Sequence, residues 1–269
     1  MDNASDMVPS IDKALRDVMN NSLSELEAAL NCDVFTYFGP IADGLENGIL
    51  GIIEDLANTP EKRDTLAVIL TTYGGSAAAV ERFVNIIRHH YSKVIFIVPD
   101  CAYSAGTIFC MSGDEIWMDY FSVLGPIDPQ VPNKDGKYVP ALGYLDKINE
   151  LIKKAQDGTL TQAEFLILKD FDLAELRGYE QAKELTISLL KKWLVKYKFA
   201  DWNTTETTHR PVTEEDKKSR AREIAEQLGK NTKWHIHSRP IMLDDLRRLR
   251  IRIDDYTYNE PLKKLIRQY

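Results

Sequence analysis

The chain has 269 residues, a formal net charge of -7 and 44% hydrophobic residues, a composition typical of a folded globular protein. The negative charge gives no reason to expect nucleic-acid binding, and three cysteines without a CxxC spacing argue against a disulfide framework or a zinc site. The N-terminus lacks the pattern of a signal peptide, and the most apolar stretch, 94–111, is interrupted by Pro99 and Asp100. We therefore expect a cytoplasmic protein without an integral membrane segment.

Buried strands alternate with helices along the first half of the chain. Residues 10–30 have the apolar spacing of a helix, and residues 34–42 are rich in the β-branched and aromatic residues typical of strands. Continuous apolar runs at 65–72 and 93–99 predict strands that are buried on both faces. The other elements expected here are helices over 47–57 and 77–91 and from residue 104, and short strands over 115–119 and 122–127. This alternation predicts an α/β fold with a largely parallel sheet and flanking helices.

Helical spacing dominates the second half, from about residue 141 to about residue 199. The polar stretch 201–213 is the predicted linker, and a helix is expected to start near Thr213, with Asp216 in a capping-box position. We predict three parts, which are an N-terminal helical arm over 1–33, an α/β core over 34–200 and a C-terminal extension over 201–269.

Two turns rich in small residues follow the two buried strands. Gly74 and Gly75 come after the strand at 65–72, and Ser104 comes after the strand at 93–99. Ligands bind at the carboxyl ends of parallel strands, and a serine at a helix N-terminus lies beside backbone N–H groups that could stabilise an oxyanion. A serine in this position is also the usual helix N-cap, and Gly-Gly is also an ordinary turn. The glycine patterns of nucleotide-binding loops are absent from the sequence.

The ordered set of motifs around these turns resembles the ClpP/crotonase superfamily. The segments concerned are TTYGGSAAA and PDCAYSAGTIFCMSGDEIWMDYFSVLGPIDPQV, followed by YVPALGYLDKI and WHIHSRPI. The branch they resemble is the signal peptide peptidase A-like group, which includes the serine dehydrogenase proteinases, and the match covers roughly 34–255. The resemblance implies a ClpP/crotonase-like fold and a serine peptidase that forms an acyl-enzyme. It also implies a peptide or protein substrate, a homo-oligomer and no cofactor.

The resemblance also implies roles for individual residues. Ser104 matches the nucleophile, Gly75 and Ala105 match the N–H donors of the oxyanion hole, and Lys147 matches the base of a Ser–Lys dyad. The stretch 124–130 lacks the histidine of Clp-type triads, which favours the dyad. An extended peptide is expected to run along strand edges, and the residues predicted to bind it are Gly74, Ser76, Leu124 and Gly125.

Lys147 can act as a base only if burial lowers its pKa from the ordinary value near ~10.4. Its neighbours Tyr144, Leu145 and Ile148 are mostly apolar and permit partial burial. Most helix lysines are solvated surface charges, so this assignment depends on the resemblance. Lys154 lies on the same helical face and is the reserve candidate.

Two other functions stay open from the sequence. A crotonase-type enzyme acting on acyl-CoA would use the same N–H groups for an enolate without needing Ser104, and a non-catalytic scaffold would use the fold for assembly. His235 and His237 are two positions apart, so on a strand both would point to the same side and could be half of a metal site. No further ligand has suitable spacing, so we expect no metal site. We expect a packing or interface role for both histidines. Asp128 could orient Lys147 or stabilise a turn.

Overall fold

The computed structural model describes residues 10–132, 136 and 138–269, so the first nine residues of the predicted N-terminal arm lie outside the described residues. Its centre is a five-stranded sheet in the order β1-β2-β3-β5-β9, with every neighbouring pair parallel. The strands of this sheet are β1 (Asp33–Phe38), β2 (Thr65–Thr71), β3 (Lys93–Val98), β5 (Glu115–Met118) and β9 (Asp254–Asp255).

Two small sheets and a set of helices complete the chain. β4 (Cys101–Ala102) pairs in parallel with β6 (Val123–Leu124), and β7 (Gln130–Pro132) pairs antiparallel with β8 (Tyr138–Pro140). The helices are α1 (Ser10–Leu30), α2 (Glu46–Ala57), α3 (Ala77–His90), α4 (Ala105–Cys110), α5 (Ala141–Gln156), α6 (Gln162–Lys169), α7 (Leu173–Trp193), the π-helix η1 (Leu194–Lys198), α8 (Glu214–Gly229), α9 (Asn231–Trp234), α10 (Leu243–Arg248) and α11 (Glu260–Gln268).

The apolar runs of β2 and β3 form the middle of the sheet. Alternate residues of a strand point to opposite faces, so a strand that is apolar at every position supplies two cores at once. In β2, Leu66 and Val68 belong to the core on one face, and Ala67 and Ile69 belong to the core on the other. The prediction of strands buried on both faces is confirmed.

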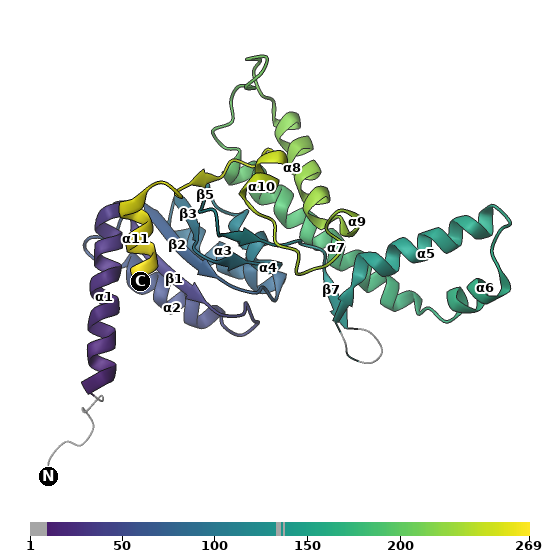
Figure 1. Ribbon diagram of the computed structural model, residues 1–269, viewed down its shortest axis with the longest axis horizontal. Helices are drawn as coiled ribbons and strands as arrows, with labels where there is room; N and C mark the ends of the chain where they lie inside the picture. Colours follow the sequence, from purple (N-terminus) through teal and green to yellow (C-terminus); the bar gives the residue numbers. More distant parts are fainter. Residues whose placement is uncertain (1–9, 133–135, 137) are drawn as a thin grey trace, which may run out of the picture.

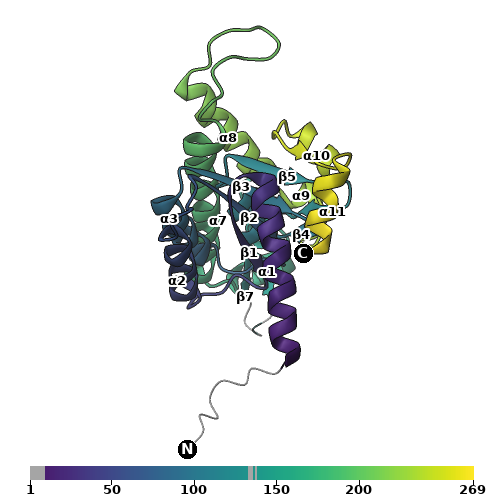
Figure 2. The same cartoon turned by 90° about the vertical axis from the view of Figure 1, so that its left-hand side faces the viewer.

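Helices cover both faces of the sheet (Figures 1 and 2). The larger core includes residues of α2, α3, α4, α7 and α8, and α1 and α11 cover the opposite face. Leu26 of α1 joins Leu262 and Ile266 of α11 in the smaller core. The predicted α/β class, with a largely parallel sheet and flanking helices, is confirmed.

The helical stretch expected at 141–199 is divided into several helices. α5 and α6 form an arm that extends away from the sheet, and α7 returns to it (Figure 1). Polar caps start the new helices, because Thr161 forms a capping box with Glu164 at α6 and Asp172 accepts backbone N–H bonds at α7. The capping box expected at Thr213 is present at α8. The strand expected over 122–127 is shorter in the structure, where β6 comprises only Val123–Leu124.

The C-terminal segment is part of the central layer. β9 pairs with β5, and α11 lies beside α1 (Figure 1). The division into an arm, a core and an extension at residues 33/34 and 200/201 stays a prediction, and segments from both flanks pack on the sheet.

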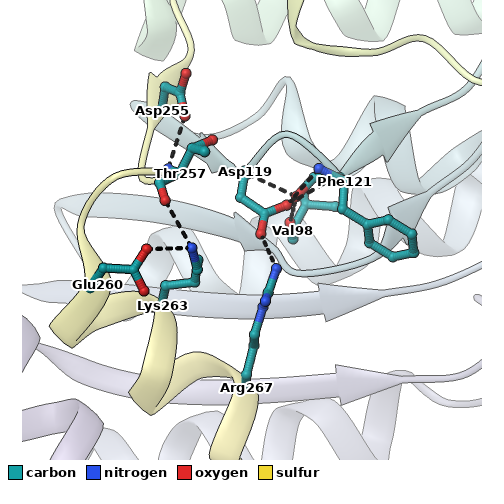
Figure 3. Close-up of polar contacts among 9 residues, drawn as sticks. Val98, Asp119, Phe121, Asp255, Thr257, Glu260, Lys263 and Arg267 are labelled. Carbon is teal, nitrogen blue, oxygen red and sulfur yellow. Dashed lines mark hydrogen bonds and ion pairs between the residues drawn. The ribbon is translucent and has the colours of Figure 1, made fainter.

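A buried carboxylate, Asp119, fastens α11 to the end of β5 (Figure 3). Its Oδ1 accepts hydrogen bonds from the backbone N–H groups of Phe121 (2.8 Å) and Ser122 (3.1 Å), and its Oδ2 accepts one from Arg267 of α11 (2.9 Å). The Asp119 side chain is 2% exposed. Burial of a carboxylate is costly unless hydrogen-bond donors surround it, as they do here.

We expect Asp119→Ala to lower the free energy of unfolding by about 2–3 kcal/mol, because it leaves two backbone donors at the turn without their acceptor. Urea unfolding measures the change. Asp244→Ala is the matched control, since Asp244 pairs with Arg247 on the surface and should give no measurable change. Equal midpoints for Asp119→Ala and wild type would show that this carboxylate does not hold the turn.

Candidate active site

The two turns singled out from the sequence meet beyond the carboxyl ends of β2 and β3. Thr72 donates its backbone N–H to the Cys101 carbonyl (2.9 Å), and Tyr103 donates its own to the Thr72 carbonyl (3.0 Å). Gly74 then packs directly on Ser104, since a Cβ at Gly74 would lie 2.7 Å from the Ser104 Cβ. The structure thus brings the Gly74-Gly75 turn and Ser104 together, as the ends of adjacent parallel strands predict.

Ser104 has an unusual backbone conformation at the start of α4. Its φ of 53° and ψ of -116° lie outside the regions that residues with a side chain commonly occupy. Such strain clusters at functional sites, and a serine on a strained strand-to-helix turn is the arrangement that exposes a nucleophilic hydroxyl. The hydroxyl does not cap the helix. The sequence predicted the helix start but carried no signal for this conformation.

The two expected oxyanion donors lie on either side of this contact. Ala105 is the first residue of α4, where a backbone N–H has no partner inside the helix. Gly75 has a φ of 142°, and a Cβ there would lie 2.0 Å from the Ile41 carbonyl oxygen. Among the described residues, neither the Gly75 nor the Ala105 N–H has an acceptor. Both donors are therefore available to a bound group.

The residues expected to bind substrate already make hydrogen bonds within the chain. Gly74 donates its N–H to Thr72 Oγ1 (3.0 Å), and Ser76 caps α3 and donates its hydroxyl to Asp43 (2.7 Å). Leu124 exchanges backbone bonds of 3.0 and 2.8 Å with Ile241, and Gly125 donates to Thr107 Oγ1 (2.9 Å). These bonds position the turns, and a substrate role for the four residues stays a prediction.

Lys147, the expected general base, lies on the exposed arm helix α5. Its side chain is 55% exposed, and its Nζ donates to both carboxylate oxygens of Glu150 at 3.0 Å. Within the described part of the chain, no hydrogen bond joins it to Ser104. The structure does not bring the two dyad residues into contact within this chain.

Two other lysines, Lys154 and Lys198, have shifted pKa values that bear on whether they could act as the general base. Hydrogen bonds to Glu164 and then Glu150 raise the pKa of the reserve candidate Lys154, which keeps it protonated and makes it a poor base. Burial lowers the pKa of Lys198 to about 8. Lys198 donates to the Asp114 carbonyl just before β5 (3.3 Å), at the amino edge of the sheet, opposite the edge that carries Ser104.

A histidine–carboxylate pair adjoins the Ser104 turn. His237 Nδ1 lies 2.9 Å from Asp128 Oδ1, and the Asp128 side chain is 2% exposed. The segment of Asp128 reaches the turn, because Gly125 packs on Tyr103, and the segment of His237 joins it where Ile241 pairs with Leu124. Since a carboxylate only accepts hydrogen bonds, a neutral His237 carries its hydrogen on Nδ1 and presents Nε2 as a base. The sequence marked both residues separately, but nothing in a spacing of 109 positions pairs them.

Within 10–132, 136 and 138–269, no group of three or more histidine, cysteine, aspartate or glutamate side chains is arranged to hold a metal ion. The helices of those same ranges include none that combines the length and apolar character needed to cross a bilayer.

Comparisons with known proteins agree with the sequence motifs. The uncharacterized protein MJ1495 of Methanocaldococcus jannaschii is 30% identical over 203 residues, covering 76% of this chain and 56% of that protein. A second uncharacterized protein of the same organism, MJ0137, is 31% identical over 151 residues, covering 51% of this chain and 49% of the relative. The chain thus spans about half the length of the curated relatives it matches.

A solved structure of a mutant of the membrane-bound stomatin-specific protease 1510-N aligns with a TM-score of 0.49 and 16% identity, covering 86% of this chain and 82% of that one. The family model described as ClpP-like SDH-type serine proteinase matches residues 46–210, which include Gly75, Ser104 and Lys147. The chain therefore belongs to the ClpP-like SDH-type serine proteinases.

Proposed function

We propose that this chain hydrolyses peptide bonds with Ser104 as its nucleophile. The observation that carries the proposal is the strained Ser104 turn, which sets a hydroxyl beside the unpaired N–H groups of Gly75 and Ala105. In many acyl-transfer enzymes, preorganised hydrogen-bond donors at the position of the developing oxyanion make the largest contribution to the rate enhancement. A nucleotide or metal function has no comparable support among the described residues.

In the proposed reaction the Ser104 Oγ attacks the substrate carbonyl while a base takes its proton. Gly75 and Ala105 hold the resulting oxyanion, the C–N bond breaks, and the base returns the proton to the leaving amine. Water then attacks the acyl carbonyl and gives a proton to the same base, the C–O bond to Ser104 breaks, and the base returns the proton to the Ser104 oxygen as the carboxylic acid leaves. The cycle needs no cofactor.

For the base we propose His237, oriented by Asp128, with the Ser104–Lys147 dyad as the competing assignment. Two features support the histidine, which are its bond to a buried carboxylate and the packing of the segment that carries Asp128 on the Ser104 turn. The dyad would require Lys147 to leave Glu150 and to lose its solvation.

The expected homo-oligomer stays a proposal with one structural support. Phe165, Leu166 and Ile167 on α6 are each more than half exposed, and they lie on the arm that projects from the sheet (Figure 1). Exposed apolar clusters of this kind mark interaction surfaces.

Ser104 should be the residue that a small alkyl fluorophosphonate modifies. We expect labelling of wild type and none of Ser104→Ala, because phosphonylation requires the activated hydroxyl. Intact-mass and peptide mass spectrometry measure the adduct. Ser188→Ala is the matched control and should label like wild type, since Ser188 is an exposed serine of α7 whose hydroxyl donates to the Leu185 carbonyl. An adduct on another residue, or none on wild type, would refute the nucleophile.

Gly75→Ala should slow acylation by the same probe on the order of 10²–10³-fold, because a side chain there displaces an oxyanion donor. Gly158→Ala is the control. Gly158 also has a positive φ, of 65°, but a Cβ at this position would have no neighbour within 4 Å, and the residue lies between α5 and α6. Both proteins are first checked for native thermal unfolding. A folded Gly75→Ala with the wild-type rate would remove Gly75 from the oxyanion hole.

The base is identified by turnover of a peptide ester as a function of pH. If His237 is the base, His237→Ala and Asp128→Asn lower the rate by about 10²–10⁴-fold, and Lys147→Ala leaves it unchanged. His235→Ala controls for disturbance of the segment. Loss of activity in Lys147→Ala and Lys147→Arg, with His237→Ala active, would establish the dyad instead.

A further inference from the structure

An aromatic pair stands directly beside the proposed nucleophile. The rings of Tyr73 and Tyr103 are stacked, with centroids 6.2 Å apart and planes inclined by 7°. Tyr73 immediately precedes the Gly74-Gly75 turn, and Tyr103 immediately precedes Ser104. Both rings are therefore tied by the backbone to the two elements that supply the nucleophile and the oxyanion donors.

Close backbone packing fixes the inner ring. A Cβ at Gly125 would lie 2.4 Å from the Tyr103 ring carbon Cδ1, so the absence of a side chain at Gly125 makes room for this ring. Gly74 in turn packs on the Tyr103 carbonyl and on Ser104. Burial, with smaller contributions from nearby Cys101 and Asp100, raises the pKa of Tyr103, so its phenol stays neutral at physiological pH. Tyr103 thus forms a rigid apolar support for the outer ring.

The outer ring has no evident structural role. Tyr73 is 81% exposed and belongs to neither core, and within the described part of the chain its hydroxyl has no hydrogen-bond partner. Phe38, at the end of the adjacent strand β1, is exposed as well. Covering a solvent-exposed aromatic ring with an apolar group lowers the free energy. Exposed aromatic patches therefore often mark binding surfaces.

We propose that Tyr73 and Tyr103 form a specificity surface that binds an apolar, preferentially aromatic, side chain of the substrate next to the scissile bond. This inference rests on the proposed peptidase function, because it is the peptide attacked by Ser104 that brings the side chain to the rings. Stacked and edge-on contacts between rings add to the free energy of burial, which makes an aromatic side chain the preferred occupant.

The test is the cleavage profile of a mixed peptide library, read by mass spectrometry for wild type, Tyr73→Ala and Tyr258→Ala. Tyr258 is a matched control, because it is 90% exposed and follows β9, at the far side of the sheet from β2. We expect wild type and Tyr258→Ala to favour Phe, Tyr, Trp or Leu at one position within two residues of the cleaved bond. Tyr73→Ala should lose about tenfold in kcat/KM on those peptides and little on peptides with Ala there.

Labelling by the small fluorophosphonate separates this inference from the proposed function. It should be the same for Tyr73→Ala and wild type, since the probe has no side chain to place on the rings. Normal labelling with no aromatic preference, or with a preference for Lys or Arg that Tyr73→Ala removes, overturns the specificity surface and leaves the nucleophile standing. Absence of labelling on wild type refutes the proposed function.

Binding provides a measurement that does not depend on turnover. Ser104→Ala protein should bind a pentapeptide with a central Phe about tenfold more tightly than the same peptide with a central Asp, as measured by calorimetry. The added substitution Tyr73→Ala should remove most of that difference. Equal affinities for the two peptides in Ser104→Ala protein overturn the inference even if no cleavage is observed.

Discussion

The contact between Gly74 and Ser104 is the constraint on which the site depends. Two chain segments from neighbouring strands approach so closely there that no side chain fits between them. The approach holds because Thr72 exchanges backbone bonds with Cys101 and Tyr103, which extends the pairing of the parallel strands beyond their ends. Ser104 is thereby held in its strained conformation, and the free N–H groups of Gly75 and Ala105 face the same region. Strain of this kind persists only where the surrounding structure over-determines it.

Sequence periodicity predicted β1, β2, β3 and β5, but it predicted neither β9 nor the chemistry around the sheet. β2 and β3 could be predicted because a strand that is apolar at every position has to be covered on both faces. The position of Ser104 at a helix start followed from local pattern, but its φ of 53° did not, because it results from the packing of Gly74. The pairing of Asp128 with His237 could not be predicted either, because long-range contacts leave no trace in a single sequence's local spacing.

The arm illustrates a different limit of sequence reasoning. Apolar neighbours around Lys147 suggested burial, but those side chains pack along one face of α5, and the lysine lies on another. Tyr144 contacts Phe171 and Tyr179, whereas Lys147 and Lys154 share Glu150 in solvent. Exposed ion pairs of this kind contribute little to stability and weaken with salt. The rings, more than the charges, therefore hold the arm helices together.

The outermost strand at the C-terminal side of the sheet consists of two residues, Asp254 and Asp255. An unpaired edge strand is a template on which a second chain can add a strand, and β5, with Trp117 and Met118, would be the edge on this side of the sheet without β9. The short strand β9 pairs with Trp117 and Met118 of β5 and leaves little length on which a second chain could add a strand. Asp255 is itself held by Arg247, so the carboxylate stays at that border. The segment after α10 therefore limits intermolecular strand addition at this edge of the sheet.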